Sequence, residues 1–266
     1  MTMRTPTRIL AVLALAAGLI APAAAASAAK AHKPSYRVLV FSKTTGFRHA
    51  SIPHGIAAIQ KLGQDNRFAV DTTEDDSQFT DANLAKYKAV IFLSTTGDPV
   101  TTPDAKAAFQ RYIEHGGGYL GIHAAADSGY NWAWYGGLVG AYFRDHPAIQ
   151  QATVRVPDND TAATRGLPEK WVRTDEWYNF RSNPRDAVRV LATIDESTYN
   201  PVGYTGGSMG ADHPMAWCHR YDGGRAVYTA FGHTEASYTE PLFLKHLLGS
   251  IKMAAGRAGF DCDADD

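Results

Sequence analysis

The sequence predicts an α/β domain with a mainly parallel sheet, helices on both faces and antiparallel β additions. In the first half, short apolar runs rich in β-formers alternate with segments whose apolar residues follow helical spacing. The second half holds further strand-like runs and a hairpin. Buried parallel strands read as continuous apolar runs and need crossover helices, so the alternation favours a parallel sheet covered on both faces.

Three apolar runs in the first half are expected to form strands, at 36–41, 88–93 and 119–122. A helix is expected to start at Ser51, where isoleucines and a leucine recur at helical spacing. A second helix is expected after Thr102, because Thr, Pro and Asp suit the cap and the first two helical positions. Three glycines at 116–118 end it.

Four strand-like runs are expected in the second half, at 152–156, 188–194, 215–221 and 225–231. The last two form a hairpin joined through Asp222, Gly223 and Gly224. A final helix is expected to start near 239–241 and to continue to Gly256. These elements supply the antiparallel additions.

The first residues have the pattern of a secretory signal peptide, at 1–28. Arg4 and Arg8 precede an apolar stretch that is too short for a membrane span, and small residues follow. We expect an exported, extracellular protein without a membrane span, with a linker at 29–35, one α/β domain at 36–257 and a polar tail at 258–266.

Export carries both cysteines, Cys218 and Cys262, to an oxidising compartment, so the sequence predicts a disulfide that ties down the tail. The alternative is a buried Cys218 beside a free Cys262. The 26 basic and 27 acidic residues give a net charge of -1 without a run of like charge. This balance disfavours nucleic acid and anionic membranes as partners and leaves a small molecule or oligosaccharide.

Histidines stand where predicted strands end. His49 comes after the first strand, His123 follows the 119–122 strand, His233 follows the last strand, and His213 precedes a hairpin strand. Ligands of parallel sheets bind beyond the carboxyl ends of the strands, so these side chains are expected to converge. No role at the site is expected for the five histidines at the surface, at helix ends, in the linker or in the last helix: His54, His115, His219, His32 and His246.

The run 117–126 has the shape of a nucleophile elbow, with small residues around His123. Neither Ser nor Cys occupies the turn, which excludes acyl-enzyme and amidotransferase chemistry through that position. At a helix N-terminus, His123 would stay neutral and act as a base, a hydrogen-bond donor or a metal ligand. The alternative is a histidine that only satisfies backbone groups.

Two aromatic segments are candidates for sugar stacking, because aromatic faces pack on the C–H faces of sugars. Trp132, Trp134 and Tyr135 follow the elbow, and ordinary core packing is their alternative role. Trp177 and Tyr178 follow Glu176, whose carboxylate suits acid or base work.

A divalent metal, zinc or similar, is a further possibility, with His49, His123, His213 and His233 as candidate ligands. No local signature such as H-E-x-x-H supports it, and no cofactor is certain. Without a metal, the same histidines would serve as acids, bases and hydrogen-bond donors.

Six motifs in order resemble the ThuA-like, or trehalose-utilisation, family over about residues 36–254; they lie at 46–49, 116–125, 145–147, 175–178, 213–214 and 231–234. The resemblance implies a flavodoxin-like domain similar to class I glutamine amidotransferases but without their Cys. It also implies a link to sugar metabolism, often to 3-keto sugars. Because the leader is expected to export this chain, intracellular trehalose catabolism does not simply carry over to it from the family.

The matched motifs add Phe47, Arg48 and His146 to the expected substrate-binding residues. We expect a secreted sugar-active enzyme on a glycoside or 3-keto glycoside, in which His123 and Glu176 transfer protons. His49, His213 and His233 would polarise a carbonyl or hydroxyl group, directly or through a metal. The alternatives are a non-catalytic carbohydrate-binding or accessory module, and hydrolysis through two carboxylates with Asp127 or Asp175 beside Glu176.

Overall fold

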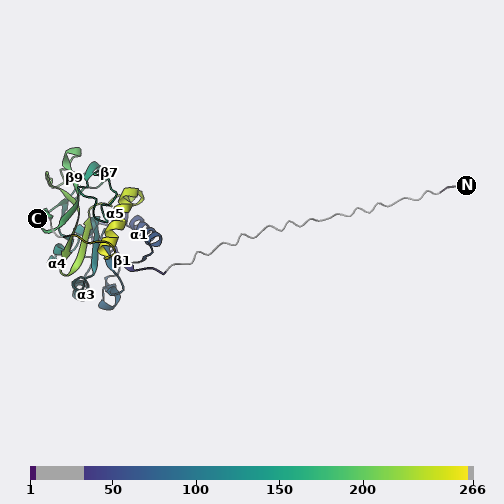
Figure 1. The fold of residues 1–266 in the computed structure, drawn as a ribbon, viewed down its shortest axis with the longest axis horizontal. Helices are drawn as coiled ribbons and strands as arrows, with labels where there is room; N and C mark the ends of the chain where they lie inside the picture. Colours follow the sequence, from purple (N-terminus) through teal and green to yellow (C-terminus); the bar gives the residue numbers. More distant parts are fainter. Residues whose placement is uncertain (4–32, 263–266) are drawn as a thin grey trace. The chain divides into compact units, whose positions relative to one another are not determined.

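A mixed β-sheet forms the centre of the domain in the computed structural model, which describes residues 1–3 and 33–262 (Figure 1). Among the described residues, nine strands pair in one sheet; in sheet order they are β2 (Ala69–Thr73), β1 (Arg37–Phe41), β3 (Ala89–Leu93), β4 (Gly118–Ile122), β11 (Gly224–Thr229), β10 (Pro214–Tyr221), β9 (Arg189–Asp195), β6 (Gln150–Arg155) and β7 (Lys170–Asp175). A separate two-stranded sheet pairs β5 (Phe143–Asp145) with β8 (Asn179–Phe180).

The sheet divides into a parallel and an antiparallel part at β11. Strands β2, β1, β3, β4 and β11 are parallel, and β11, β10, β9, β6 and β7 alternate in direction. This alternation makes β7 run the same way as β4 and β11. The carboxyl ends of the parallel strands and of β7 therefore point in one direction, which decides where the site forms.

Five α-helices are described: α1 (Ile52–Asn66), α2 (Asp81–Leu84), α3 (Pro103–Glu114), α4 (Ala133–Val139) and α5 (Pro241–Ala254). Helices α1 and α5 contact each other on one side of the sheet, and α3 and α4 lie toward the other (Figure 1). Thr102 caps α3 as predicted, because its hydroxyl accepts a hydrogen bond from the amide of Ala105. The predicted α/β class, with a parallel core and antiparallel additions, is confirmed.

Two strands of the large sheet are absent from the elements that the sequence predicts. Edge strand β2 is half-buried and carries Asp and Thr in place of an apolar run. Strand β7 alternates exposed and buried residues, but two of its three buried positions are Arg173 and Asp175. Charged residues at inward positions conceal the apolar period that would mark a strand.

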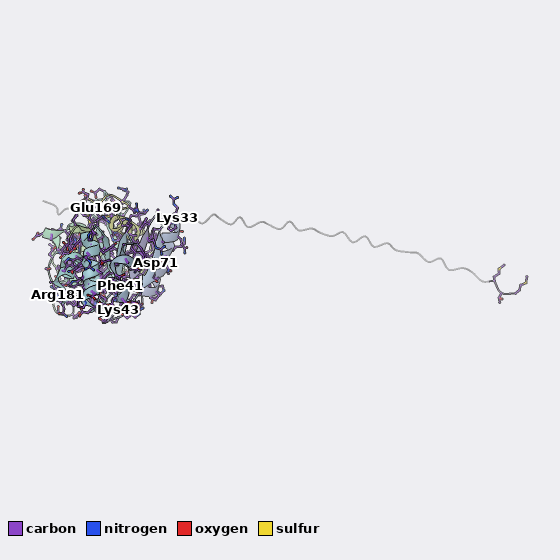
Figure 2. All side chains as sticks on the ribbon, turned by 90° about the horizontal axis from the view of Figure 1, so that it is seen from below. Lys33, Phe41, Lys43, Asp71, Glu169 and Arg181 are labelled. Carbon is purple, nitrogen blue, oxygen red and sulfur yellow. A yellow bond between two sulfur atoms is a disulfide. The ribbon has the colours of Figure 1, made fainter. Side chains whose placement is uncertain are left out.

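The core is built from the apolar faces of the sheet, and β3 and β4 are buried along their whole length. Figure 2 shows Phe41 of β1 within the domain, whereas Lys43, which follows β1, and Arg181 lie toward one end of it, and Lys33 and Glu169 lie toward the other. The carboxyl end of β1 therefore marks the end of the domain at which the predicted histidines should gather.

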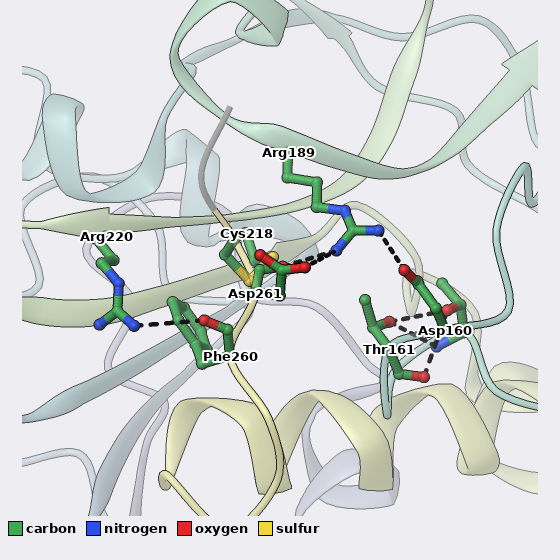
Figure 3. Close-up of a disulfide and its surroundings, with 9 residues drawn as sticks. Asp160, Thr161, Arg189, Cys218, Arg220, Phe260 and Asp261 are labelled. Atoms are coloured by element: carbon green, nitrogen blue, oxygen red, sulfur yellow. Dashed lines mark hydrogen bonds and ion pairs between the residues drawn. A yellow bond between two sulfur atoms is a disulfide. The ribbon is translucent and has the colours of Figure 1, made fainter. Parts of the chain in front are cut away.

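The predicted disulfide joins Cys218 of β10 to Cys262. Figure 3 shows the tail beside it, where Arg189 reaches Asp261 and Arg220 donates to the carbonyl of Phe260. The signal peptide predicted at 1–28 lies outside the described residues beyond residue 3, as do residues 29–32 of the linker and 263–266 of the tail. Within the part of the chain that the structure describes, no helix is long and apolar enough to cross a membrane.

Candidate functional site

Three histidines and one glutamate meet where strands of the same direction end. His123 directly follows β4 and Glu176 directly follows β7, while His49 and His233 lie on the loops after β1 and β11. One ligand atom from each side chain lies within 4.8 Å of those of the other three. We call these four residues the His/Glu cluster. The predicted convergence of His49, His123 and His233 is therefore observed.

The elbow holds His123 in a left-handed backbone conformation, with φ of 50°. Non-glycine residues rarely adopt this region, and such strain is common at functional sites. Small buried residues surround it, and Nδ1 of His123 lies 2.8 Å from the carbonyl oxygen of Ala230. That contact leaves Nε2 facing the cluster. The residues after the turn form a short 3-10 helix, His123–Asp127, so the expected α-helix N-terminus is not present there.

Glu176 lies at the centre of the polar contacts, and it is 6% exposed. Its carboxylate oxygens lie 3.5 Å from Nε2 of His123, 3.1 Å from Nδ1 of His233 and 3.3 Å from Nδ1 of His146. Burial alone would raise the pKa of Glu176, but the hydrogen bonds from His123 and His233 outweigh it and hold this pKa well below its usual range. Burial opposes the charge of His233, yet the contact with Glu176 raises the pKa of His233.

His49 is buried, and its Nδ1 has no hydrogen-bond partner among the described residues. Burial, followed by the charges of His123 and His233, lowers the pKa of His49 to about 3, so the ring is neutral at physiological pH. A buried nitrogen without a partner costs free energy, and such exceptions need an explanation. Three imidazoles around one carboxylate are a ligand set that zinc and similar ions accept, so the cluster can hold a metal.

Asp175 builds the turn that carries His233. Its side chain is fully buried and accepts hydrogen bonds from the amides of Gly232, His233 and Thr234 at 2.8, 3.1 and 3.2 Å. It also pairs with Arg173 at 2.8 Å. These contacts draw the end of edge strand β7 to the end of β11, although three strands separate them in the sheet. The contacts occupy both oxygens of Asp175, which disfavours it as the second acid of a two-carboxylate mechanism.

Asp127 is the other acid considered for that mechanism. Its Oδ1 accepts a hydrogen bond from the hydroxyl of Tyr130 at 2.6 Å, and burial raises its pKa. Asp127 therefore remains a candidate for the second acid of that mechanism. It is not one of the four residues whose ligand atoms converge.

His213 does not join the cluster, contrary to the expectation from the sequence. It is fully buried, its Nδ1 lies 2.9 Å from Oε1 of Glu196, and its Nε2 lies 2.8 Å from the carbonyl oxygen of Tyr178. Both ring nitrogens thus have partners, and one of them holds the chain segment at the backbone of Tyr178, two residues after Glu176. His213 can position that segment, but it cannot reach the ligand atoms of the cluster in this arrangement.

The aromatic segment after the elbow packs in the domain and does not face the cluster. The rings of Trp132 and Trp134 stack at 5.3 Å against each other, and both contact Phe109 of α3. Nε1 of Trp134 donates to Asp222 in the hairpin turn, at the amino end of β11. Tyr135 is buried and bonds to the carbonyl of Ala125. The alternative role, core packing, therefore fits these three rings better than the sugar stacking expected for them.

Trp177 is likewise a core residue, because it is fully buried and its Nε1 donates to the carbonyl of Gln150. Its neighbour Tyr178 does reach the site, and its ring lies 4.2 Å from that of His123. Of the two rings that were expected to stack on a sugar, Trp177 thus lies in the core and Tyr178 lies at the site. Arg48 stands at the surface in an ion pair with Glu74 at 2.6 Å.

Three exposed or half-exposed rings border the cluster. Phe47 lies 4.9 Å from the ring of His49, and Tyr204 lies 5.3 Å from the ring of His146. Phe47 and His146 are predicted from the sequence, whereas Tyr204 is not. Tyr204 lies in a glycine-rich loop far from any predicted strand end, and no pattern in the sequence marks it as part of a site.

Comparison with known proteins places the chain in a family. The family described as trehalose utilisation, ThuA, matches residues 37–254. A ThuA-like protein from Bacteroides uniformis ATCC 8492 is 24% identical with a TM-score of 0.69, over 85% of this chain and 95% of that chain. Another from Parabacteroides merdae ATCC 43184 is 20% identical with a TM-score of 0.68, over 88% and 98%.

The fold also occurs inside larger enzymes. A β-galactosidase from Bacillus circulans sp. alkalophilus is 14% identical with a TM-score of 0.54, and the match covers 85% of this chain but 32% of that chain. At this identity the likeness concerns the fold alone. Among curated proteins, none matches this chain. The family match spans most of the sequence, and the chain belongs to the ThuA, or trehalose utilisation, family.

Proposed function

We propose that this protein is a secreted, metal-dependent enzyme that acts on a glycoside or 3-keto glycoside. The observation that carries the proposal is the gathering of His49, His123, Glu176 and His233, which place one ligand atom each within 4.8 Å of one another. The ring of His49 lies 4.9 Å from that of His123 and 5.1 Å from that of His233. A metal ion would explain why three buried ligand groups and the half-buried His233 gather at one place. The family description, trehalose utilisation, supports a sugar as the substrate.

His49, His123, Glu176 and His233 would hold the ion, which supplies a Lewis acid that polarises a substrate carbonyl or hydroxyl oxygen. Proton transfer to and from the substrate would fall to His146. Its side chain is one-third exposed, and its Nδ1 contacts Oε1 of Glu176 at 3.3 Å. An imidazole that faces solvent and touches the cluster can exchange a proton with a bound substrate. His123 and Glu176, expected from the sequence to transfer protons, would then serve as ligands.

A 3-keto glycoside suits this arrangement because its carbonyl acidifies the neighbouring C2–H bond. A base such as His146 removes that proton, the electron pair forms the C1–C2 double bond, and the C1–O bond breaks. The leaving alcohol takes up one proton from the protonated base or from water. This route needs one base and one group that stabilises the carbonyl, and it needs no second carboxylate.

The proposal is tested by release of nitrophenol from 4-nitrophenyl 3-keto-glucoside and from 4-nitrophenyl glucoside, with zinc-loaded and chelated protein. Zinc-loaded protein should cleave the keto substrate, and chelation or His123→Ala should abolish cleavage. His54→Ala is the matched control, because His54 is exposed and pairs only with Glu235 at 3.6 Å among the described contacts.

Cleavage that persists in chelated protein or in His123→Ala would refute the metal-dependent mechanism. Sugar binding without any product would favour the alternative of a non-catalytic carbohydrate-binding module. Preferred cleavage of the plain glucoside would favour hydrolysis through carboxylates, with Asp127 as the acid to test first.

A further inference from the structure

Two aromatic side chains break the pattern of burial in the described domain. Among the described residues, every Phe, Tyr and Trp is buried or half-buried except Phe47 and Tyr204, which are 68% and 67% exposed. Both of these rings contact a histidine of the site. Exposed aromatic rings that gather at one place mark a binding surface, whereas scattered ones need no explanation.

The two rings stand at opposite ends of a series of ring contacts. Phe47 contacts His49, His49 contacts His123, and His123 contacts Tyr178, with centroids 4.9, 4.9 and 4.2 Å apart. From Tyr178 the series continues to His146 at 6.3 Å and from His146 to Tyr204 at 5.3 Å. Ring contacts therefore connect the His/Glu cluster to both exposed rings.

The loop that presents Tyr204 is anchored by hydrogen bonds. Buried Asp145 accepts hydrogen bonds from the amide and hydroxyl of Thr205 and from the side chain of Asn179. The amide of Gly203 donates to the carbonyl of Gly207 at 2.9 Å. A Cβ atom on Gly203 would lie 2.1 Å from Oδ1 of Asp145, so only glycine fits there. Since Asp145 also precedes His146, one carboxylate fixes both the loop and that histidine.

Phe47 is held in a similar way from the other side. Its carbonyl accepts a hydrogen bond from Oγ1 of Thr96 at 2.9 Å, and the hydroxyl of Thr96 in turn accepts a hydrogen bond from the amide of Gly46 at 3.2 Å. Both exposed rings therefore project from backbones that are fixed before a ligand arrives. Preorganised aromatic groups bind ligands at a lower entropic cost than mobile ones.

Resting on the proposed function, we propose that Phe47 and Tyr204 form a two-sided aromatic clamp that takes a substrate with two rings. One ring of the substrate stacks on Phe47, the other stacks on Tyr204, and the bond that joins them lies over the His/Glu cluster. The substrate class is then a disaccharide, or a glycoside whose leaving group is itself a ring. A monosaccharide or a methyl glycoside reaches one side of the clamp only.

The test measures binding of trehalose and of glucose to the intact zinc-loaded protein by calorimetry. Trehalose should bind about tenfold tighter than glucose, and Phe47→Ala and Tyr204→Ala should each weaken trehalose binding about tenfold. Glucose binding should change in one of these two variants at most. Tyr204→Phe should keep the affinity, because the ring acts and the hydroxyl does not. Val202→Ala, at an exposed position of the same loop, is the control for loop disturbance.

Equal affinities for trehalose and glucose, or unchanged trehalose binding in both alanine variants, would overturn the clamp. The proposed function would still stand in that case if the wild type releases nitrophenol. Absence of binding of both sugars to the wild type, together with absence of nitrophenol release, would overturn the proposed function and the clamp together.

Discussion

Oδ1 of Asp175 accepts a hydrogen bond from the amide of His233 at 3.1 Å, and this contact joins the last residue of β7 to the loop after β11. The same carboxylate pairs with buried Arg173. It therefore links two elements that are distant in the sheet and carries Glu176 and His233 into one site. Asp175 is a positioning residue for the cluster.

Removal of this carboxylate should destabilise the fold. Asp175→Ala leaves Arg173 buried at 4% exposure with Glu240 as its remaining charged partner, and breaking a buried pair costs about 3–5 kcal/mol. Urea unfolding should show that loss. Glu74→Ala, which breaks an exposed pair with Arg48, should cost about 1 kcal/mol or less. Equal losses in the two variants would contradict the role of Asp175.

The disulfide should stabilise the domain mainly by restricting the unfolded chain. Cys218 and Cys262 are 44 residues apart, and a loop of this size corresponds to about 4 kcal/mol in the chain-entropy treatment. Reduction should lower the free energy of unfolding of the wild type by up to this amount. The double variant Cys218→Ala/Cys262→Ala should be as stable as the reduced wild type and should not respond to reductant. A reductant effect on the double variant would show that the change has another origin.

His246 should make stability depend on pH. Burial lowers its pKa to about 4, and its nitrogens bond to the carbonyl of Ala163 and the hydroxyl of Thr229. The unfolded chain protonates this histidine near 6.5 while the folded chain keeps it neutral, so stability falls as the pH drops from about 6.5 to about 4. The loss approaches about 3 kcal/mol. Unfolding at several pH values should show a smaller loss in His246→Gln, and an equal loss would contradict this assignment.

His213 should act on the site only indirectly. His213→Ala removes the contact with the carbonyl of Tyr178 and leaves Glu196 without its histidine partner. Because His213 lies outside the His/Glu cluster, the variant should keep its metal while turnover of the keto glycoside falls. Elemental analysis beside the nitrophenol assay separates the two effects. Loss of the metal in His213→Ala would show that our ligand set is wrong.

The sequence predicts the parallel half of the sheet apart from edge strand β2, and it predicts all four residues of the His/Glu cluster as site residues. The signal that marks each of these residues differs. His123 and His233 follow apolar runs, so the ends of the strands locate them. Glu176 follows β7, a strand that the charged pair Arg173 and Asp175 conceals, and only its motif singles it out.

Other features of the site depend on tertiary packing, which spacing does not encode. Trp132 and Trp134 are residue types that bind sugars by stacking, but both rings pack against Phe109 of α3. His213 has the residue type of a ligand, but its nitrogens are engaged elsewhere. Tyr204 reaches the site only because buried Asp145 anchors its loop.

The most direct test of the account is the metal content of the purified intact protein, measured by elemental analysis in the wild type, His49→Ala and His54→Ala. The wild type and His54→Ala should hold about one equivalent of a divalent metal, and His49→Ala should lose most of it. Retention of the metal in His49→Ala, or a wild type without metal after incubation with zinc, would contradict the metal-dependent site.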